Sequence, residues 1–145
     1  MRIIGGKNKG KKIYLPIDKN TRPLRDLVKE SIFNLIEHSN KFNTSIANSI
    51  VLDLFSGTGS FGLECFSRGA KFITFVENYS GVLNILKKNI SNMDAISCSE
   101  VIENNCFELF NERKKISKKF DIIFLDPPYK NKSINLLINL IINQK

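Results

Sequence analysis

The stretch IVLDLFSGTGSFG (residues 50–62) decides the fold. Its first part, Ile50 to Phe55, is apolar except for one acid, which is typical of a parallel strand buried on both faces. The strand leads directly into a turn with the G-x-G-x-x-G spacing of Gly57, Gly59 and Gly62. Such a turn lets the backbone approach a ligand closely and opens onto the N-terminus of a helix. The same spacing suits a dinucleotide, and it also suits a structural turn that binds nothing.

Strands and helices alternate on both sides of this stretch. Further strands are expected at Phe72 to Glu77, around Val101 to Glu103, and at Phe120 to Leu125. Helices are expected at Leu24 to His38, Ser60 to Arg68, Ser80 to Ile90, Phe107 to Arg113, and from about Ser133. Strands separated by helices form a parallel sheet, so we expect an α/β, Rossmann-like fold with a mostly parallel sheet. A single domain should cover the chain, with a basic N-terminal arm over residues 1–22 and the core over residues 23–145.

The N-terminal part contains a basic segment and an amphipathic helix. The segment from Arg2 to Lys12 is basic and punctuated by glycine, which suits a mobile arm or a short hairpin beside a phosphate backbone, although a plain linker would look the same. Pro23 suits the first turn of the helix that follows. Apolar residues at helical spacing predict the buried face of this helix, and they are Leu24, Leu27, Val28, Ile32, Leu35 and Ile36.

Composition limits the class of protein and of partner. A chain of 145 residues that is 42% hydrophobic can bury one core. The net charge of +8 favours nucleic acid as a partner, although a genome-wide bias toward lysine would also produce it. Three cysteines without metal-ligand spacing and a single histidine predict neither a metal site nor a disulfide framework. The longest apolar run, Ile134 to Ile142, is too short for a membrane span, and no signal-peptide pattern opens the chain. We therefore expect a protein of the cytoplasm or of the interior of an organelle.

Glu77 closes the second strand of the predicted sheet, 20 residues beyond Gly57. Open α/β sheets bind ligands at the carboxyl ends of their strands, where a carboxylate can accept both hydroxyls of an adenosine ribose. The spacing also fits the dinucleotide fingerprint, so Glu77 indicates a nucleoside ligand without naming it. A solvated acid at a strand end is the alternative that needs no ligand.

The turn Asp126-Pro127-Pro128-Tyr129, which follows the fourth predicted strand, indicates the chemistry. Its two prolines lack backbone donors and leave carbonyl acceptors, so the turn is suited to receive hydrogens. The exocyclic amine of a base is a poor nucleophile because its lone pair is delocalised. If the Asp126 carboxylate and the Pro127 carbonyl accept its two N–H groups, the lone pair is freed to attack a sulfonium methyl. Tyr129 would stack on a base that is flipped out or single-stranded.

The sequence resembles the RsmD-type family of 16S ribosomal RNA guanine-N2 methyltransferases along nearly its whole length. The resemblance rests on the opening residues 1–6, on Arg22-Pro23 with the helix after it, on Asp53-x-Phe55-x-Gly57-x-Gly59, and on residues 126–129. It implies that S-adenosylmethionine is the cofactor, with Asp53 to Gly59 lining its pocket. It further implies that Glu77 holds the ribose, that Asn105 lies near the adenine amine, and that the helix from Pro23 helps to enclose the methionine end.

The resemblance also implies a partner and an open sheet edge. Ribosomal RNA or the small ribosomal subunit would be the substrate, and no metal would be needed. Members of that family continue beyond this turn with three more strands of a seven-stranded sheet, so we expect the fourth strand here to have an unpaired apolar edge. A monomer is expected, and a dimer if that edge is covered.

Three other functions remain open from the sequence. A nicotinamide-dependent oxidoreductase would explain the glycines and Glu77 but has no use for residues 126–129. A DNA adenine or cytosine amino-methyltransferase would use the same turn for another amine. A non-catalytic RNA-binding remnant would bind RNA in a salt-sensitive way without methyl transfer.

Overall fold

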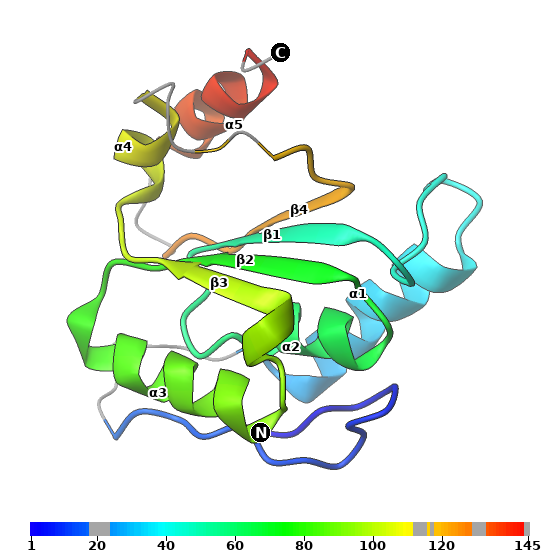
Figure 1. The fold of residues 1–145 in the computed structure, drawn as a ribbon. Coiled ribbons are helices and arrows are strands. Elements are labelled where there is room, and N and C mark those ends of the chain that lie inside the picture. Colours follow the sequence, from blue (N-terminus) through cyan, green and yellow to red (C-terminus); the bar gives the residue numbers. More distant parts are fainter. Residues whose placement is uncertain (18–23, 112–115, 117, 129–132, 144–145) are drawn as a thin grey trace.

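Four parallel strands form one sheet in the order β3-β2-β1-β4 (Figure 1). The computed structural model describes residues 1–17, 24–111, 116, 118–128 and 133–143. The strands are β1 (Ile50–Leu54), β2 (Phe72–Val76), β3 (Ser99–Ile102) and β4 (Ile122–Leu125). The helices are α1 (Asp26–His38), α2 (Ser60–Ser67), α3 (Ser80–Asn92), the 3-10 turn η1 (Ile96–Cys98), α4 (Cys106–Asn111) and α5 (Ile134–Ile142).

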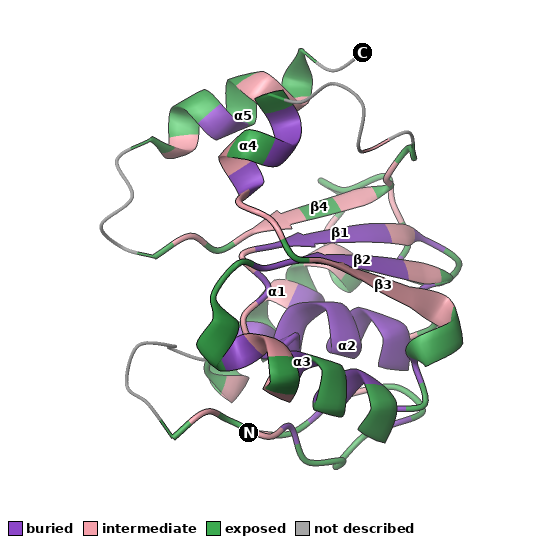
Figure 2. Cartoon of the chain, turned by 60° about the vertical axis from the view of Figure 1, so that its left-hand side comes forward, coloured by how far each residue is buried: buried purple, intermediate pink, exposed green. Residues whose placement is uncertain are grey.

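Helices cover both faces of the sheet. Figure 1 shows α1, α2 and α3 on one side, and α4 and α5 on the other. Side chains of β1 alternate between the two layers, so that Val51 packs in the cluster with α2 and α3, whereas Leu52 and Leu54 pack with α4 and α5. The central strands β1 and β2 and the whole of α2 are the most buried elements (Figure 2). The predicted α/β fold with a parallel sheet is therefore confirmed.

Most elements lie within a few residues of their predicted bounds, but the predicted buried face of α1 is right only in part. Ile32 and Ile36 pack against the core, as predicted. Leu27 is 75% exposed and Leu35 is 57% exposed, and Val28 is exposed as well. The face that packs on the sheet side is carried by Lys29 and Phe33, one helical turn apart. The apolar spacing placed the face incorrectly at Leu27, Val28 and Leu35 because Lys29 occupies a buried position that a pattern of hydrophobic residues does not count. Pro23, predicted in the first turn, lies outside the described residues.

The β4 edge is open among the described residues, as predicted. β4 pairs only with β1 in that part of the chain, and Ile123 is 37% exposed. A groove of about 310 Å³ lies between α1 and this edge, and Phe42 and Phe61 are among the residues that line it. Aspartate 121, at the start of β4, fixes the register there because its carboxylate accepts the Ile50 amide at 2.8 Å.

The N-terminal segment packs on the core and is not a mobile arm. Arg2 and Lys12 form an antiparallel bridge, and Ile3 and Ile13 are fully buried in the same cluster as β1 and β2. Of the two predicted possibilities, the structure therefore has the short hairpin. The segment lies beneath α2 and α3 in Figure 1.

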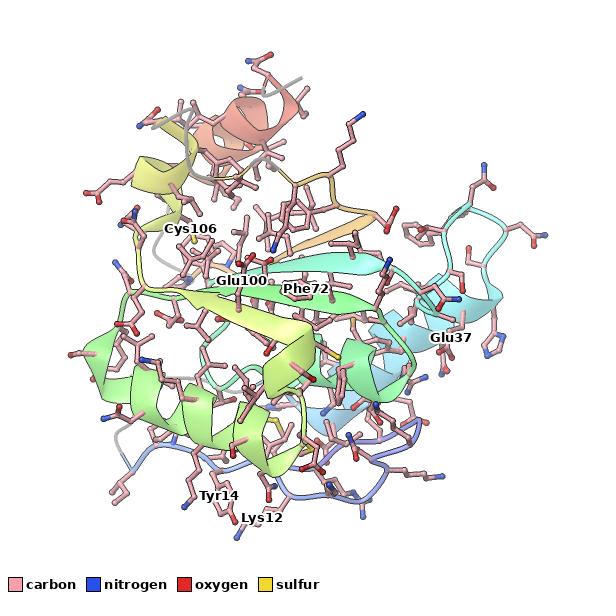
Figure 3. The ribbon with its side chains drawn as sticks, in the orientation of Figure 1. Lys12, Tyr14, Glu37, Phe72, Glu100 and Cys106 are labelled. Carbon is pink, nitrogen blue, oxygen red and sulfur yellow. The ribbon has the colours of Figure 1, made fainter. Side chains whose placement is uncertain are left out.

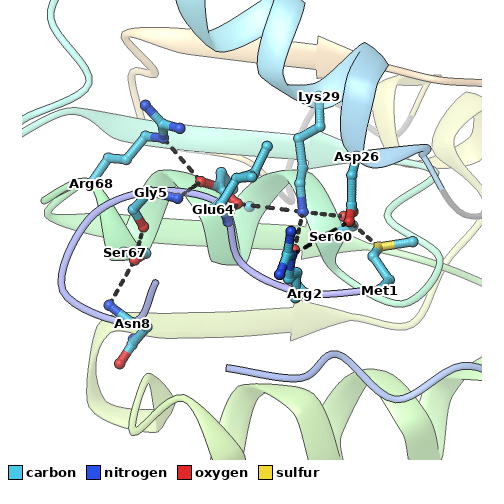
Figure 4. A network of polar contacts seen from close by, with 12 residues as sticks. Met1, Arg2, Gly5, Asn8, Asp26, Lys29, Ser60, Glu64, Ser67 and Arg68 are labelled. Atoms are coloured by element: carbon cyan, nitrogen blue, oxygen red, sulfur yellow. Dashed lines mark hydrogen bonds and ion pairs between the residues drawn. The ribbon is translucent and has the colours of Figure 1, made fainter. Parts of the chain in front are cut away.

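A buried ion pair between α1 and α2 holds this segment in place (Figure 4). Lys29 and Glu64 are both fully buried, with 3.4 Å between the Lys29 Nζ and a Glu64 carboxylate oxygen. Glu64 also accepts the amides of Ile4 at 2.9 Å and Gly5 at 2.7 Å, while Lys29 donates to the Arg2 carbonyl at 2.7 Å. Burial lowers the pKa of Lys29, and the neighbouring Glu64 charge opposes that shift. The pair thus satisfies main-chain groups of residues 2–5 that the core would otherwise leave without partners.

Replacing Glu64 should destabilise the fold far more than replacing Glu37. Glu64→Ala leaves the Lys29 ammonium buried without a counter-ion, and loss of one partner of a buried pair costs about 3–5 kcal/mol. Glu37 pairs with Arg68 at 2.9 Å near the surface, so Glu37→Ala should cost no more than about 1 kcal/mol. Urea unfolding of both variants measures the difference. Equal losses of unfolding free energy would mean that the Lys29–Glu64 pair does not anchor the segment.

Candidate active site

The carboxyl ends of the four strands stop at the same edge of the sheet. Leu54 of β1 is aligned with Val76 of β2 and with Leu125 of β4, and Val76 is aligned with Ile102 of β3. The residue after each strand therefore leaves the sheet at the same level. These residues are Phe55, Glu77, Asp126 and Glu103, and three of them are predicted site residues.

Asp53 joins β1 to the start of α2. Its carboxylate is 1% exposed and accepts the Gly62 amide at 2.9 Å. Gly62 is the third residue of α2, whose N-cap, Gly59, has no side chain to offer. Asp53 thus supplies from the strand the acceptor that a side chain at the N-cap normally provides.

The three glycines of the turn are required for two different structural reasons. Gly57 and Gly59 have positive φ values of 53° and 80°, which glycine adopts without strain. Gly62 has no such φ, but a Cβ there would come within 2.4 Å of the Phe75 ring. The spacing therefore combines two left-handed residues with one close contact between α2 and β2. Phe55, just before the turn, is also left-handed at φ 57°, and its ring lies edge-on to Phe107 at 6.4 Å.

Glu77 connects the glycine turn to the start of α3. One carboxylate oxygen accepts the Gly57 amide at 2.8 Å. The other accepts the amides of Asn78 and Tyr79, each at 2.9 Å. The acid is 9% exposed, so it is part of the wall of the site and not a solvated strand end.

Three acids lie close together at this edge. Burial raises the pKa of Asp53 to about 8; the Gly62 hydrogen bond opposes the shift, and the charges of Asp126 and Glu77 add to it. Asp126 is exposed at the surface, and partial loss of its contact with water raises the pKa of its carboxyl. The structure thus brings Asp53, Glu77 and Asp126 within electrostatic reach of one another. Such a group of acids favours a cationic ligand.

Three of the remaining predicted residues, Asn105, Pro127 and Pro128, follow strands that end at the same edge. Asn105 follows β3, and its side-chain oxygen accepts the Phe107 amide at 2.8 Å, which caps α4. Its amide nitrogen, which can donate, has no hydrogen-bond partner among the described residues. Pro127 is partly buried and Pro128 is exposed after β4. Tyr129 lies outside the described residues. The groove between α1 and β4 contains none of these residues.

Asn89 is a structural residue that the sequence reasoning missed. It is fully buried in α3 and donates to the carbonyls of Tyr14 and Thr58, both at 3.0 Å, while its oxygen accepts the Tyr14 amide at 2.8 Å. It thereby connects the N-terminal segment to the glycine turn. A signal was present, because Asn89 interrupts the apolar stripe formed by Val82, Leu86 and Ile90.

The described residues contain no group of three or more histidine, cysteine, aspartate or glutamate side chains placed to bind a metal ion. None of the helices in that part of the chain has the length and apolar character required to cross a membrane.

Comparison with known proteins gives consistent matches. Residues 1–145 match the protein family described as Conserved hypothetical protein 95. Ribosomal RNA small subunit methyltransferase D of Buchnera aphidicola is 37% identical over 99% of this chain, and that of Escherichia coli K12 is 31% identical over 97%. The chain spans 70% and 66% of the lengths of these two relatives.

The solved structures include a similar fold. The Escherichia coli protein yhhF, described as a candidate methyltransferase, superposes with a TM-score of 0.80 at 30% identity. The match covers 99% of this chain and 72% of the other. The predicted Rossmann-like methyltransferase fold is confirmed by this likeness together with the parallel sheet.

The raised pKa of Asp53 predicts how stability depends on pH. Between the usual value of 3.8 and about 8 the folded chain keeps a proton that the unfolded chain has lost, so this group reduces stability as pH rises through that window. Asp53→Asn keeps an acceptor for Gly62 but does not titrate. The melting temperature of the natural chain should therefore fall relative to that of Asp53→Asn from pH 4 to pH 8. Asp94, 88% exposed, provides the control Asp94→Asn. If the melting temperatures of both variants differ from that of the natural chain by amounts that do not change with pH, the assignment is contradicted.

Proposed function

We propose that this chain, which belongs to the family described as Conserved hypothetical protein 95, methylates ribosomal RNA with S-adenosylmethionine as the methyl donor. Membership confirms the RsmD-type resemblance predicted from the sequence. The observation that carries the proposal is the common sheet edge at which the glycine turn, Glu77 and Asp126 meet. The exocyclic N2 amine of a guanine in the small-subunit RNA is the proposed acceptor, and the small ribosomal subunit is the proposed partner.

Glu77 is suited to hold the ribose of the donor. A carboxylate offers about four acceptor sites, and three of those of Glu77 are used by the amides of Gly57, Asn78 and Tyr79. One ribose hydroxyl can use the remaining site. The second requires the Gly57 amide to move, so donor binding would rearrange the glycine turn. Asn105, with a free amide nitrogen at the same edge, is proposed to lie near the adenine ring.

The acids at the edge fit a donor that carries positive charge. When bound, S-adenosylmethionine supplies an electrophilic methyl group on a sulfonium. Asp53 and Asp126 would stabilise that charge, and its presence would in turn favour the ionised form of Asp53, whose pKa burial raises to about 8. The backbone of Phe55 and of the glycine turn lies next to Asp53, where the donor is proposed to bind. A dinucleotide carries negative phosphates instead, which these acids would repel.

Asp126 and the Pro127 carbonyl are proposed to hold the amine that is methylated. Pro127 and Pro128 have no N–H to compete, so the acceptors at this turn stay available for the two amine hydrogens. Accepting both hydrogens frees the nitrogen lone pair and stabilises the positive charge that develops on nitrogen. Tyr129 is proposed to stack on the target base. Asp126 can take the released proton once the carbon–nitrogen bond has formed.

Methyl transfer to small ribosomal subunits tests the proposal. Subunits from a strain without the modification are incubated with the chain and labelled S-adenosylmethionine, and nucleosides are then analysed. We expect labelled N2-methylguanosine with the natural chain, and none with Asp126→Ala, which should retain donor affinity. The control Glu108→Ala replaces an exposed acid on α4 and should remain active. Label in adenosine or cytidine, or in naked DNA only, would exclude guanine N2, and unchanged turnover by Asp126→Ala would remove Asp126 from the mechanism.

Replacing Glu77 should act on donor affinity. Glu77→Ala should weaken binding of S-adenosylmethionine by about 1–3 kcal/mol, the usual cost of losing a charged hydrogen-bond partner. Calorimetric titration measures this change. Glu103 closes β3 in the equivalent place but pairs with Lys87 at the surface, so Glu103→Ala is the matched control and should bind normally. Equal affinities for all three proteins would show that the ribose is held elsewhere, and tighter binding of NAD would favour an oxidoreductase.

A further inference from the structure

The segment around Tyr14 is fixed against α3. Asn89 makes hydrogen bonds with both the amide and the carbonyl of Tyr14, at 2.8 and 3.0 Å. Nearby, the Asn92 side chain donates to the Lys12 carbonyl at 3.3 Å. Ile13, between Lys12 and Tyr14 in the sequence, is fully buried. Because Asn89 also donates to the Thr58 carbonyl, the position of Tyr14 is set relative to the glycine turn.

Two lysines approach the Tyr14 ring. The Lys88 Nζ lies 4.0 Å from the ring centroid and the Lys12 Nζ lies 5.9 Å from it. Figure 3 shows Lys12 and Tyr14 together beneath α3. Both lysines are exposed, and an aromatic ring within about 6 Å holds such a cation by attraction to its face.

The charge of these two lysines is not neutralised. In the part of the chain that the structure describes, no carboxylate pairs with Lys12 or Lys88, whereas Lys87 pairs with Glu103 and Lys11 pairs with Asp94. Lys12, Tyr14 and Lys88 therefore form a small surface with uncompensated positive charge and one aromatic ring. We refer to these three residues as the α3 basic surface.

We propose that the α3 basic surface docks the phosphate backbone of the RNA substrate. Two ammonium groups held over one ring can each neutralise a phosphate, and the tyrosine hydroxyl can donate to a third oxygen. Since Asn89 connects Tyr14 to the glycine turn, RNA bound here is held at a fixed position relative to the methyl donor. The inference rests on the proposed function for the identity of the RNA, and on the net charge of +8 for its anionic character.

Salt dependence of RNA binding tests this surface. A fluorescent fragment of small-subunit ribosomal RNA is titrated with the full chain at several salt concentrations, without methyl donor. Lys12→Gln/Lys88→Gln removes two phosphate contacts, so the slope of log affinity against log salt should fall by about 1.4, or about 0.7 for each contact to single-stranded RNA. Lys88→Arg keeps the cation over the ring and should bind as the natural chain does.

The matched control is Lys41→Gln/Lys71→Gln. Both lysines are exposed, and the variant loses the same charge at places away from Tyr14. We expect it to retain the slope of the natural chain, and all variants to keep its melting temperature. Equal slopes for the two double variants would overturn the proposal, as would binding to phosphatidylglycerol vesicles in preference to RNA.

The two proposals can fail separately. Normal methyl transfer with an unchanged salt slope in Lys12→Gln/Lys88→Gln would refute the docking surface and leave the function standing. A lowered slope with no methyl transfer by the natural chain would refute the function and keep an RNA-binding surface.

Discussion

The hydrogen bond from the Gly62 amide to the buried Asp53 carboxyl determines the arrangement of the site. It holds the first turn of α2 against the end of β1, and the chain between them has only a few residues in which to reverse. Two left-handed glycines make that reversal possible, and the missing side chain of Gly62 lets α2 approach Phe75. The tight course of the turn, in which only Phe55 and Gly57 are partly exposed, is a consequence of this one constraint.

Buried polar side chains, in addition to apolar packing, join the neighbouring elements to that turn. Glu77 connects it to the start of α3, and Asn89 connects it to the N-terminal segment. Glu64 and Lys29 fix the other end of the segment between α1 and α2. Each of these side chains is buried and satisfies main-chain groups, so the N-terminal segment and the candidate site form one continuous network.

The sequence predicted the elements better than it predicted their contacts. The strands, the parallel sheet and the edge residues Glu77 and Asp126 follow from local patterns, because strand ends and glycine turns are local properties. The place of the N-terminal segment does not, because its partners Glu64 and Asn89 lie 59 to 75 residues away in the sequence. Part of the buried face of α1 was mistaken for a related reason, since the burial of Lys29 depends on its distant counter-ion Glu64. Lys29, Glu64 and Asn89 are polar residues at buried positions of helices, and that pattern was the signal that would have identified these contacts.

The most direct test of the account is a crystal structure of the chain with S-adenosylhomocysteine, the product that remains after methyl transfer. We predict both ribose hydroxyls within hydrogen-bond distance of Glu77, the Gly57 amide displaced from that carboxylate, and the sulfur facing Asp126 and the Pro127 carbonyl. A nucleoside bound in the groove between α1 and β4, or a sulfur directed away from Asp126, would contradict the proposed site.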